Sequence, residues 1–544
     1  MLEGCVAWPE DFAQRYRAQG YWEEITLFEL LRRSAARFPG KLAVVDGVRR
    51  RSYRELLNNV EALAAGFVAL GLRPLDRVIF QLNNSLELIE TFFALARIGV
   101  IPVMALPAHR RTEIAHFARA SGAVALLVPD LVRSFDYREM AREVLAQCPA
   151  IRAVVVSGEA GAGQTELADL AARPGAITSL GAIPDPDQVA LMLLSGGTTG
   201  LPKLIPRTHA DYIYGSRQSG RVAGFSADTV FLAILPIAHN YTLGAPGVVA
   251  TLAFGGTVVI APGTSADVVF PLIERERVTV VSAAVPLVAK WLGSDLFDCH
   301  DLDTLKVFMN GGAKLVPELR RRVEEKFHCT YQESFGTAEG LLNMTRLDDA
   351  EAVRMHSSGR PVSDGDEIKV VDPAGSELPD GQAGELLVRG PYTVRGYYNA
   401  PEINRVAFTS DGFYRMGDVV RKVRGDLYLE GRMKDMINRG GEKISCEEIE
   451  NHILANPKIE SACVVAMPDP VFGEKACAFV VLRQGSNLTL DELAGFLEGR
   501  AIARFKMPER LEIIEEFPVS PAGKILRREL RAAVIEKMAR GSPA

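Results

Sequence analysis

Residues 193–203 read Leu193-Leu194-Ser195-Gly196-Gly197-Thr198-Thr199-Gly200-Leu201-Pro202-Lys203, and they follow the apolar run Val189 to Met192, which predicts a buried strand. Glycines let backbone N–H groups converge on phosphate oxygens, the hydroxyl side chains add hydrogen-bond donors, and Lys203 adds a mobile positive charge. The spacing from the last glycine to the lysine does not match the Walker pattern, which excludes a P-loop NTPase. The stretch predicts a phosphate-binding loop, and a plain turn after a strand is the alternative.

The elements before this loop alternate between helix and strand. Helical spacing covers Thr26 to Ala35, where Thr26 and Glu29 have the spacing of a capping box. A strand pattern follows at Leu42 to Asp46, and then a long amphipathic helix at Ser52 to Leu70. Alternation of this kind favours parallel strands joined by crossover helices, so we expect one large α/β unit of about 400 residues, with subdomains.

The pattern changes near residue 360 to short strands and turns such as Glu367 to Val371, which predict a small β-rich subdomain. The last part of the chain returns to helix and strand, beginning with a helix from Cys446 to Ala455. We place the domain boundary in the polar stretch Gly431 to Asp435. The prediction is a large N-terminal α/β domain, residues 1–433, and a small mobile α+β domain, residues 434–544.

Composition narrows the class of protein. Charged residues make up 24% of the chain and the net charge is -6, with 62 basic residues spread along it, so we expect no nucleic-acid partner. The 7 cysteines are scattered and form no C-x-x-C pair, which favours reduced thiols in the cytoplasm. We see no charged-then-apolar leader and no uncharged apolar run of about 18 residues, so no membrane span is expected.

Three later segments carry residues suited to nucleotide chemistry. In Glu333 to Gly340, the carboxylate of Glu339 follows a glycine turn and suits Mg²⁺, which prefers oxygen ligands. Asp418, after Gly417, can accept hydrogen bonds from both ribose hydroxyls. Lys524 follows a glycine near the C-terminus and can neutralise charge that develops at a phosphate. Each segment taken alone also fits an ordinary surface turn.

Taken together and in this order, the segments resemble those of the adenylate-forming superfamily, which includes acyl-CoA synthetases, luciferases and peptide-synthetase adenylation domains. The resemblance covers nearly the whole chain. It implies that Glu339 holds Mg²⁺, that the C-terminal domain delivers Lys524 as the catalytic lysine, and that the chain pivots at Lys434. The residues it implies for ATP binding are Ser195, Gly196, Gly197, Thr198, Thr199, Gly200, Lys203, Gly311, Gly312, Ala313, Phe335, Gly336, Thr337, Asp418 and Arg432.

The stretch Leu235 to Gly247 contains His239-Asn240-Tyr241 and resembles the aryl-acid branch of that superfamily, the 2,3-dihydroxybenzoate and salicylate AMP ligases of siderophore assembly. An amide such as Asn240 can bond an aryl carboxylate or ortho-hydroxyl, and Tyr241 can wall the ring. A capping or turn role is the alternative for Asn240. The resemblance places His239 among the catalytic residues, and the implied aryl-acid-binding residues are Asn240, Tyr241, Ala245, Asn310 and Ser334.

Some of these positions depart from the branch. Dihydroxybenzoate ligases typically have Ser, and salicylate ligases Cys, where this chain has Ala245. Asn310 and Ser334 are polar where the relatives usually carry Val. Because a site that hydrogen-bonds a substituent discriminates strongly, such changes can alter the choice of acid. Acids with another polar substituent, such as 3-hydroxyanthranilate and 3-hydroxypicolinate, therefore stay open beside salicylate and 2,3-dihydroxybenzoate.

We expect an aryl acid–AMP ligase that uses Mg-ATP to form an aryl-adenylate, releases pyrophosphate, and passes the acyl group to a phosphopantetheine thiol on an aryl carrier protein. An aryl-CoA ligase with coenzyme A as the acceptor is the nearest alternative. A non-catalytic nucleotide-binding protein is a remote one, because Lys524, Glu339 and Asp418 are all present. The chain is expected to be a monomer or a homodimer.

Overall fold

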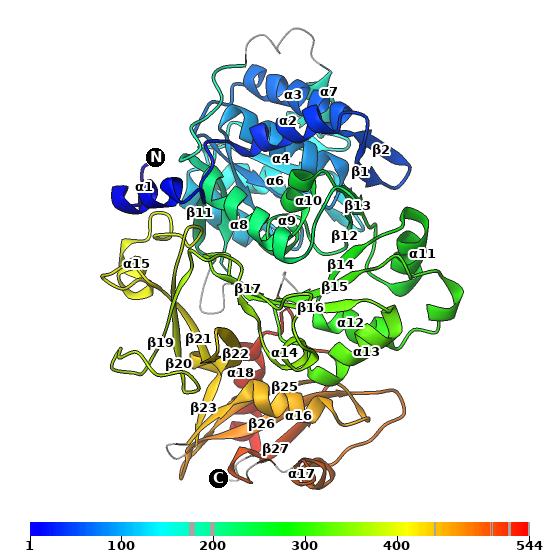
Figure 1. Ribbon diagram of the computed structural model, residues 1–544, viewed down its shortest axis with the longest axis vertical. Helices are drawn as coiled ribbons and strands as arrows, with labels where there is room; N and C mark the ends of the chain where they lie inside the picture. The colour runs from blue at the N-terminus through cyan, green and yellow to red at the C-terminus, as the bar shows by residue number, and fades with distance from the viewer. Residues whose placement is uncertain are drawn as a thin grey trace.

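The computed structural model describes residues 1–172, 180–195, 202–439, 442–500, 502, 504–520 and 524–541. Figure 1 shows the C-terminal helices and strands gathered at the lower end of the molecule, beneath strands β15 to β17. Among the described residues, none of the helices combines the length and apolar character that a membrane crossing requires.

A seven-stranded sheet carries the phosphate-loop strand. Its strands run in the order β11-β10-β4-β3-β5-β8-β9, and they are parallel except for the antiparallel pair β10–β11. Parallel strands buried on both faces read as continuous apolar runs, as Val189 to Leu193 does. The strands are β3 (Arg77–Phe80), β4 (Ile101–Met104), β5 (Ala125–Pro129), β8 (Ala153–Ser157), β9 (Thr165–Glu166), β10 (Val189–Leu194) and β11 (Leu204–Thr208).

A nine-stranded sheet carries most of the other site segments. Its order is β18-β17-β16-β15-β14-β12-β13-β1-β2, with parallel pairs in the middle and antiparallel pairs at both ends. The strands are β1 (Leu42–Asp46), β2 (Arg49–Ser52), β12 (Val230–Ala233), β13 (Thr257–Ile260), β14 (Val280–Ala283), β15 (Val307–Gly311), β16 (Thr330–Gly336), β17 (Leu342–Met344) and β18 (Arg360–Pro361).

Helices lie between the two sheets and outside each of them. One buried apolar cluster joins both sheets to α2 (Leu27–Arg37), α3 (Tyr53–Ala69), α4 (Leu86–Ile98), α8 (His209–Val222) and α10 (Val248–Phe254). The outer face of the seven-stranded sheet packs on α5 (Arg111–Ser121) and α6 (Tyr137–Gln147). The outer face of the nine-stranded sheet packs on α11 (Ala266–Glu276), α12 (Val285–Leu292) and α13 (Pro317–Phe327). The predicted α/β class is confirmed.

Two predicted helix starts are borne out in detail. The Glu29 N–H donates to Thr26 Oγ1 at 3.2 Å and the Thr26 N–H donates to Glu29 Oε2 at 3.0 Å, a complete capping box. Ser52 and Glu55 form the same arrangement at the start of α3. The remaining elements of this part are α1 (Glu10–Ala18), α7 (Leu167–Ala171), α9 (Asn240–Leu243) and the strand pair β6 (Leu131–Val132) and β7 (Phe135–Asp136).

A four-stranded antiparallel sheet follows, in the order β19-β20-β21-β22. Its strands are β19 (Glu367–Val371), β20 (Ala383–Arg389), β21 (Tyr414–Val423) and β22 (Asp426–Arg432), and α15 (Pro401–Ala407) contacts β21. The preceding helix, α14 (Glu351–His356), contacts α13 and β16 instead. This is the β-rich region that the change of pattern near residue 360 predicts.

The C-terminal part has its own sheet and its own buried clusters, which contain residues from Ile437 onward. A 3-10 turn, Met433–Asp435, stands between β22 and this sheet. The expected boundary at residues 433 and 434 stays a prediction. The elements are β23 (Met436–Arg439), β24 (Glu442–Ser445), α16 (Cys446–Leu454), β25 (Ile459–Asp469), β26 (Gly473–Leu482), α17 (Leu490–Glu498), β27 (Arg510–Ile513) and α18 (Arg527–Gly541).

Candidate active site

The predicted phosphate loop connects the two antiparallel strands β10 and β11. At its base, the Ser195 N–H donates to the Lys203 carbonyl at 3.0 Å, and the Lys203 N–H donates to Ser195 Oγ at 2.9 Å. These bonds join the two ends of the loop, so Ser195 and Lys203 are held side by side. The other predicted loop residues, Gly196, Gly197, Thr198, Thr199 and Gly200, lie outside the described residues.

Glu339 lies in a tight connection between β16 and β17. Gly340 has a φ of +143°, and a Cβ at that position would lie 2.3 Å from Thr393 Cα. The Thr337 hydroxyl donates to the Gly340 carbonyl at 3.0 Å, and the Val394 N–H donates to the Glu339 carbonyl at 2.7 Å. Only a residue without a Cβ allows this close approach of the two segments, which fixes the backbone that carries Glu339.

The Glu339 carboxylate is buried and tied to two tyrosines. The Tyr397 hydroxyl donates to Glu339 Oε1 at 2.8 Å and lies 3.2 Å from the Tyr414 hydroxyl. Burial, followed by the nearby Glu339 charge, raises the pKa of both tyrosines, so both hydroxyls keep their protons. Lys203 Nζ lies 4.7 Å from the centre of the Tyr397 ring. Tyr397 therefore brings the phosphate-loop lysine and the predicted metal carboxylate to one place.

The donor set around Glu339 suits Mg²⁺. Among the described residues, no group of three or more His, Cys, Asp and Glu side chains is arranged to hold a metal by itself. Mg²⁺ usually takes one or two protein carboxylates and completes its shell with water and substrate phosphates. A single oriented carboxylate next to a phosphate loop fits that requirement.

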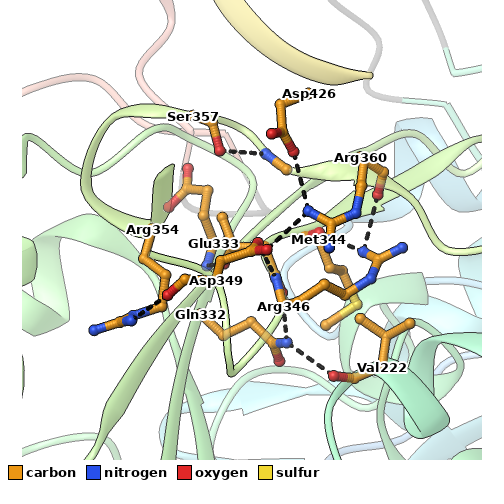
Figure 2. A network of polar contacts seen from close by, with 12 residues as sticks. Val222, Gln332, Glu333, Met344, Arg346, Asp349, Arg354, Ser357, Arg360 and Asp426 are labelled. Carbon is orange, nitrogen blue, oxygen red and sulfur yellow. Dashed lines mark hydrogen bonds and ion pairs between the residues drawn. The ribbon is translucent and has the colours of Figure 1, made fainter. Parts of the chain in front are cut away.

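A polar network connects the strand pair β17–β18 with the start of β22 (Figure 2). Arg346 donates to the carbonyls of Met344 and Arg360 at 2.6 and 3.2 Å. Arg360 in turn pairs with Asp349 at 2.9 Å and with Asp426, at the start of β22, at 3.3 Å. The network thus joins β17 and β18, which follow Glu339, to β22, the strand that pairs with the Asp418 strand β21.

Asp418 and Arg432 face each other across the pair β21–β22. The two residues are register partners, Arg432 Nε donates to Asp418 Oδ1 at 3.1 Å, and Asp418 is 1% exposed. Arg432, which orients Asp418, is the last residue before the Met433–Asp435 turn. The predicted ribose ligand, the predicted nucleotide-facing arginine and the predicted hinge lie together.

Lys524 reaches the N-terminal part of the protein. Its Cε would lie 4.0 Å from a Cβ at Gly312, a residue whose φ is +87°. Burial lowers the pKa of His239 to about 4, and the second cause is the positive charge of Lys524. The structure therefore brings Lys524 together with the Gly311-Gly312-Ala313 segment and with His239, although more than 200 residues separate them in sequence. Phe335, Gly336 and Thr337 lie on the neighbouring strand β16 and just beyond its end.

His239, Asn240 and Tyr241 lie at the start of the short helix α9. His239 Nδ1 accepts the Tyr241 N–H at 3.2 Å and so caps this helix. The Tyr241 ring lies close to the backbone of Gly311, where a Cβ would be 2.8 Å from two of its ring atoms. The Tyr212 hydroxyl donates to Asn240 Oδ1 at 3.0 Å. Ala245 packs, half-buried, against the cluster between the sheets.

Asn310 and Ser334 occupy opposite faces of the nine-stranded sheet. Ser334 pairs with Gly311, on which Tyr241 lies, and is buried. Asn310 pairs with Glu333, and its Nδ2 donates to the Ala313 carbonyl at 2.8 Å and to Glu333 Oε2 at 3.3 Å. Asn310 is thus engaged in a buried network, and its predicted contact with an aryl acid stays a prediction.

The centre of that network is the ion pair between Arg320 of α13 and Glu333 of β16. Their side chains are 0% and 3% exposed, and Arg320 Nη2 lies 3.2 Å from Glu333 Oε1. Glu333 also accepts a hydrogen bond from the Tyr331 hydroxyl. Burial raises the pKa of Glu333, and the Arg320 charge opposes that shift. This pair ties α13 to β16, the strand that contains Phe335 and Gly336.

Sequence reasoning did not identify Tyr397 or Tyr212 as site residues. Tyr397 lies 58 residues from the Glu339 that it bonds, and Tyr212 lies 28 residues from Asn240. No short motif connects either pair. The tyrosine-rich segment from Tyr392 to Tyr398 is the one sequence signal that points to this region.

Comparisons with known proteins agree with this geometry. A family model described as AMP-binding enzyme matches residues 31–398, and one described as AMP-binding enzyme C-terminal domain matches residues 448–524. The 2,3-dihydroxybenzoate-AMP ligase of Bacillus subtilis is 46% identical, with 99% of each chain covered. The salicyl-AMP ligase / salicyl-S-ArCP synthetase of Mycobacterium tuberculosis is 44% identical, with 97% of this chain and 94% of the relative covered. The apo structure of Mycobacterium smegmatis MbtA superposes with a TM-score of 0.76 at 41% identity, with 97% and 98% of the two chains covered.

Proposed function

Since this chain belongs to the family of AMP-binding enzymes, we propose that it is an aryl acid–AMP ligase acting on a 2-hydroxyaryl carboxylic acid of the salicylate or 2,3-dihydroxybenzoate type. The acid carboxylate attacks the α-phosphorus of ATP, pyrophosphate leaves, and the aryl-adenylate remains. The activated acyl group then passes to the phosphopantetheine thiol of an aryl carrier protein.

One observation carries the proposal. Lys524 from the C-terminal part lies against Gly312 and close enough to His239 for its charge to act on that imidazole. His239 directly precedes Asn240, the residue proposed to bind the acid. A lysine next to the Gly311-Gly312-Ala313 segment, with its charge acting on the residue before Asn240, would stand where charge develops as carboxylate and α-phosphate join.

The other residues each bind a different part of the ATP molecule. The leaving phosphates bind to the loop that begins at Ser195 and ends at Lys203. Asp418, oriented by Arg432, accepts hydrogen bonds from the ribose hydroxyls. The Gly311-Gly312-Ala313 segment lines the adenine, and Phe335, Gly336 and Thr337 border the nucleotide. Positioning of this kind is the main requirement of phosphoryl chemistry, since the reaction passes through a transition state stabilised mostly by electrostatics.

Glu339 would hold Mg²⁺, with Tyr397 fixing one of its carboxylate oxygens. When bound, the ion would supply positive charge that neutralises part of the charge on the leaving pyrophosphate. Burial and the Glu339 charge raise the pKa of Tyr397, so its hydroxyl keeps the proton that it donates to Glu339.

The aryl ring would lie against Tyr241, with Asn240 bonding its carboxylate or ortho-hydroxyl. Ala245 and Ser334 set the room and polarity around the ring. Salicylate and 2,3-dihydroxybenzoate are the first candidates, and 3-hydroxyanthranilate and 3-hydroxypicolinate are the alternatives.

Transfer to the thiol requires Lys524 to leave the site, because the thiol must approach the adenylate. The proposed pivot is Lys434, within the Met433–Asp435 turn. Coenzyme A in place of a carrier protein is the alternative acceptor.

The deciding experiment is ATP–pyrophosphate exchange with the purified protein and a panel of these four acids, with benzoate as the plain aryl control. Exchange that depends on one 2-hydroxyaryl acid supports the proposal. Absence of exchange with every acid tried would instead favour a non-catalytic nucleotide-binding protein. A carrier protein and coenzyme A, offered separately to the adenylate-loaded enzyme, distinguish the two acceptors.

A further inference from the structure

Asn240 is held from behind by a buried tyrosine that no motif identifies. Tyr212 lies on α8, is 2% exposed, and its hydroxyl donates to Asn240 Oδ1 at 3.0 Å. Among the described residues, Asn240 is the one hydrogen-bond partner of this hydroxyl. Burial raises the pKa of Tyr212, so the hydroxyl carries its proton at every physiological pH.

This contact fixes which end of the Asn240 amide faces outward. An amide has an oxygen that accepts and a nitrogen that donates, and the two ends exchange by a half-turn of the side chain. A buried hydroxyl proton needs an acceptor, and within the described part of the chain Asn240 Oδ1 is the acceptor that it has. The half-turn would leave the Tyr212 proton without an acceptor, so Nδ2 is directed away from Tyr212.

Tyr212 is itself fixed on two sides. A Cβ at Gly244 would lie 2.5 Å from the Tyr212 hydroxyl oxygen, so the absence of a side chain there makes room for it. On the other side, the Arg207 guanidinium lies 5.2 Å from the centre of the Tyr212 ring. Gly244 and Arg207 thus flank the buried Tyr212 side chain on two sides.

Arg207 connects this arrangement to the Glu339 segment. Its guanidinium donates to Asp211 at 2.7 Å, to the carbonyl of Ala338, directly before Glu339, at 2.9 Å, and to the carbonyl of Tyr392 at 3.1 Å. The side chains of Arg207 and Asp211 are 4% and 2% exposed. Buried charge-assisted bonds of this kind hold their partners rigidly.

We propose that Tyr212 is a positioning residue that presents Asn240 to the substrate as a hydrogen-bond donor, so that the site selects aryl acids with an acceptor atom at the ortho position. This inference rests on the proposed function, because it takes Asn240 as the acid-binding amide. It narrows the substrate class further. An ortho-hydroxyl oxygen or a ring nitrogen accepts from Nδ2, whereas an ortho-amino group brings a second donor and is rejected. Salicylate, 2,3-dihydroxybenzoate and 3-hydroxypicolinate fit this description, and 3-hydroxyanthranilate does not.

The first test uses the wild-type protein and two acids that differ in one atom group. Salicylate and 2-aminobenzoate have the same size, but one carries an ortho-hydroxyl and the other an ortho-amino group. We expect kcat/KM for exchange to favour salicylate by at least about tenfold, as is usual where a site pairs with a substituent. A preference for 2-aminobenzoate would mean that Asn240 Oδ1 faces the substrate, and the proposal would be wrong.

The second test removes the hydroxyl. Tyr212→Phe leaves the ring in place but allows the Asn240 amide to turn. We expect the KM for salicylate to rise about tenfold, the KM for ATP to change less than about twofold, and the preference for salicylate over 2-aminobenzoate and benzoate to shrink.

Tyr214→Phe is the matched control. Tyr214 lies on the same helix and is also buried, but its hydroxyl bonds Ser363 Oγ at 2.6 Å, far in sequence from Asn240. If the loss of any buried hydroxyl disturbed the whole site, the two variants would change alike. The KM for ATP would then rise together with the KM for the acid. We expect Tyr214→Phe to keep the wild-type preference.

The outcomes distinguish a failure of the proposed function from a failure of the role proposed for Tyr212. If the wild type exchanges with no aryl acid, the proposed function fails and this inference fails with it. If the wild type is active but Tyr212→Phe keeps the acid KM and the preference, the proposed function stands and Tyr212 is not a positioning residue. Should Tyr212→Phe not fold, Asn240→Asp takes its place: a carboxylate has no N–H to donate, so the preference for salicylate over 2-aminobenzoate should be lost, and retention of that preference would overturn the proposal.

Discussion

His239 shows how the environment sets the state of one side chain at this site. Its pKa is lowered to about 4 by burial and by Lys524, so the imidazole is neutral near pH 7. A neutral ring can accept the Tyr241 N–H through Nδ1, whereas a protonated ring cannot. The helix that carries Asn240 and Tyr241 therefore keeps its cap under physiological conditions. A catalytic role for His239 stays a prediction.

The role proposed for Lys524 predicts that its removal separates the two half-reactions. We expect Lys524→Ala to reduce ATP–pyrophosphate exchange by about a hundredfold or more, since the lysine stabilises charge that exists only in the transition state. Thiol transfer from a pre-formed aryl-adenylate should stay close to the wild-type rate. Single-turnover assays of each step check this, and an equal loss in both steps would contradict the assignment.

Ala245 tests the predicted choice of acid. A hydroxyl at this position would pair with a 3-hydroxyl on the ring, so Ala245→Ser should raise kcat/KM for 2,3-dihydroxybenzoate several-fold relative to salicylate. Ala245→Val is the size control, since it adds bulk without a hydroxyl and should not favour 2,3-dihydroxybenzoate. No change in the ratio for Ala245→Ser would remove this residue from the aryl-acid pocket.

At the scale of elements, the strand β16 and the helix α13 are joined by a buried ion pair. Arg320 also donates to the carbonyls of Leu315, Arg354 and Ser357 at 2.7, 2.8 and 3.0 Å, so it links α13 to the end of α14 as well. The strand that it supports leads to the Phe335 and Glu339 segment. The position of Phe335 and Glu339 therefore depends on the packing of α13 against β16 as well as on the local sequence.

Arg320→Met should therefore destabilise the protein strongly, because it leaves the Glu333 carboxylate buried without its cation, at a cost of about 3–5 kcal/mol. Thermal unfolding should show a clearly lower Tm. The exposed neighbour Arg321, which pairs with Glu351 at 3.4 Å, is the control, and Arg321→Met should change the Tm little. The double change Arg320→Met with Glu333→Gln should recover part of the loss, and a failure to recover any would mean that the ion pair is not the reason.

At the scale of the molecule, the C-terminal part lies against the large N-terminal part with Lys524 at the site. Arg500, just after α17, pairs with Glu318 of α13 at 3.6 Å, a contact between the two parts that is half-exposed and weak. A weak contact of this kind suits two parts that must separate again. The chain between them passes through the Met433–Asp435 turn.

Restricting that turn should affect only the step that needs rotation. Lys434→Pro fixes one φ angle and restricts Met433, so we expect exchange to stay within about threefold of wild type while thiol transfer slows by tenfold or more. Lys434→Ala keeps backbone freedom and should be close to wild type in both steps. If Lys434→Pro slows exchange as much as transfer, the pivot lies elsewhere.

Local patterns could be read directly from the sequence. The capping box at Thr26, the alternation of helix and strand, and the order of the phosphate loop, Glu339, Asp418 and Lys524 depend on residues close together in the chain. Such signals survive because capping, periodicity and glycine-dependent turns act over a few residues. They are sufficient for the fold class and for the family.

The tertiary structure decided the rest. That Tyr397 holds Glu339, that Tyr212 orients Asn240, and that Asn310 belongs to the Glu333 network depends on contacts across 58, 28 and 23 residues. Side chains so far apart meet only when sheets and helices pack, and hydrogen-bond direction then follows from which buried atoms need a partner. The sequence alone determined the chemistry of activation. Packing determined which end of the Asn240 amide is bonded to Tyr212.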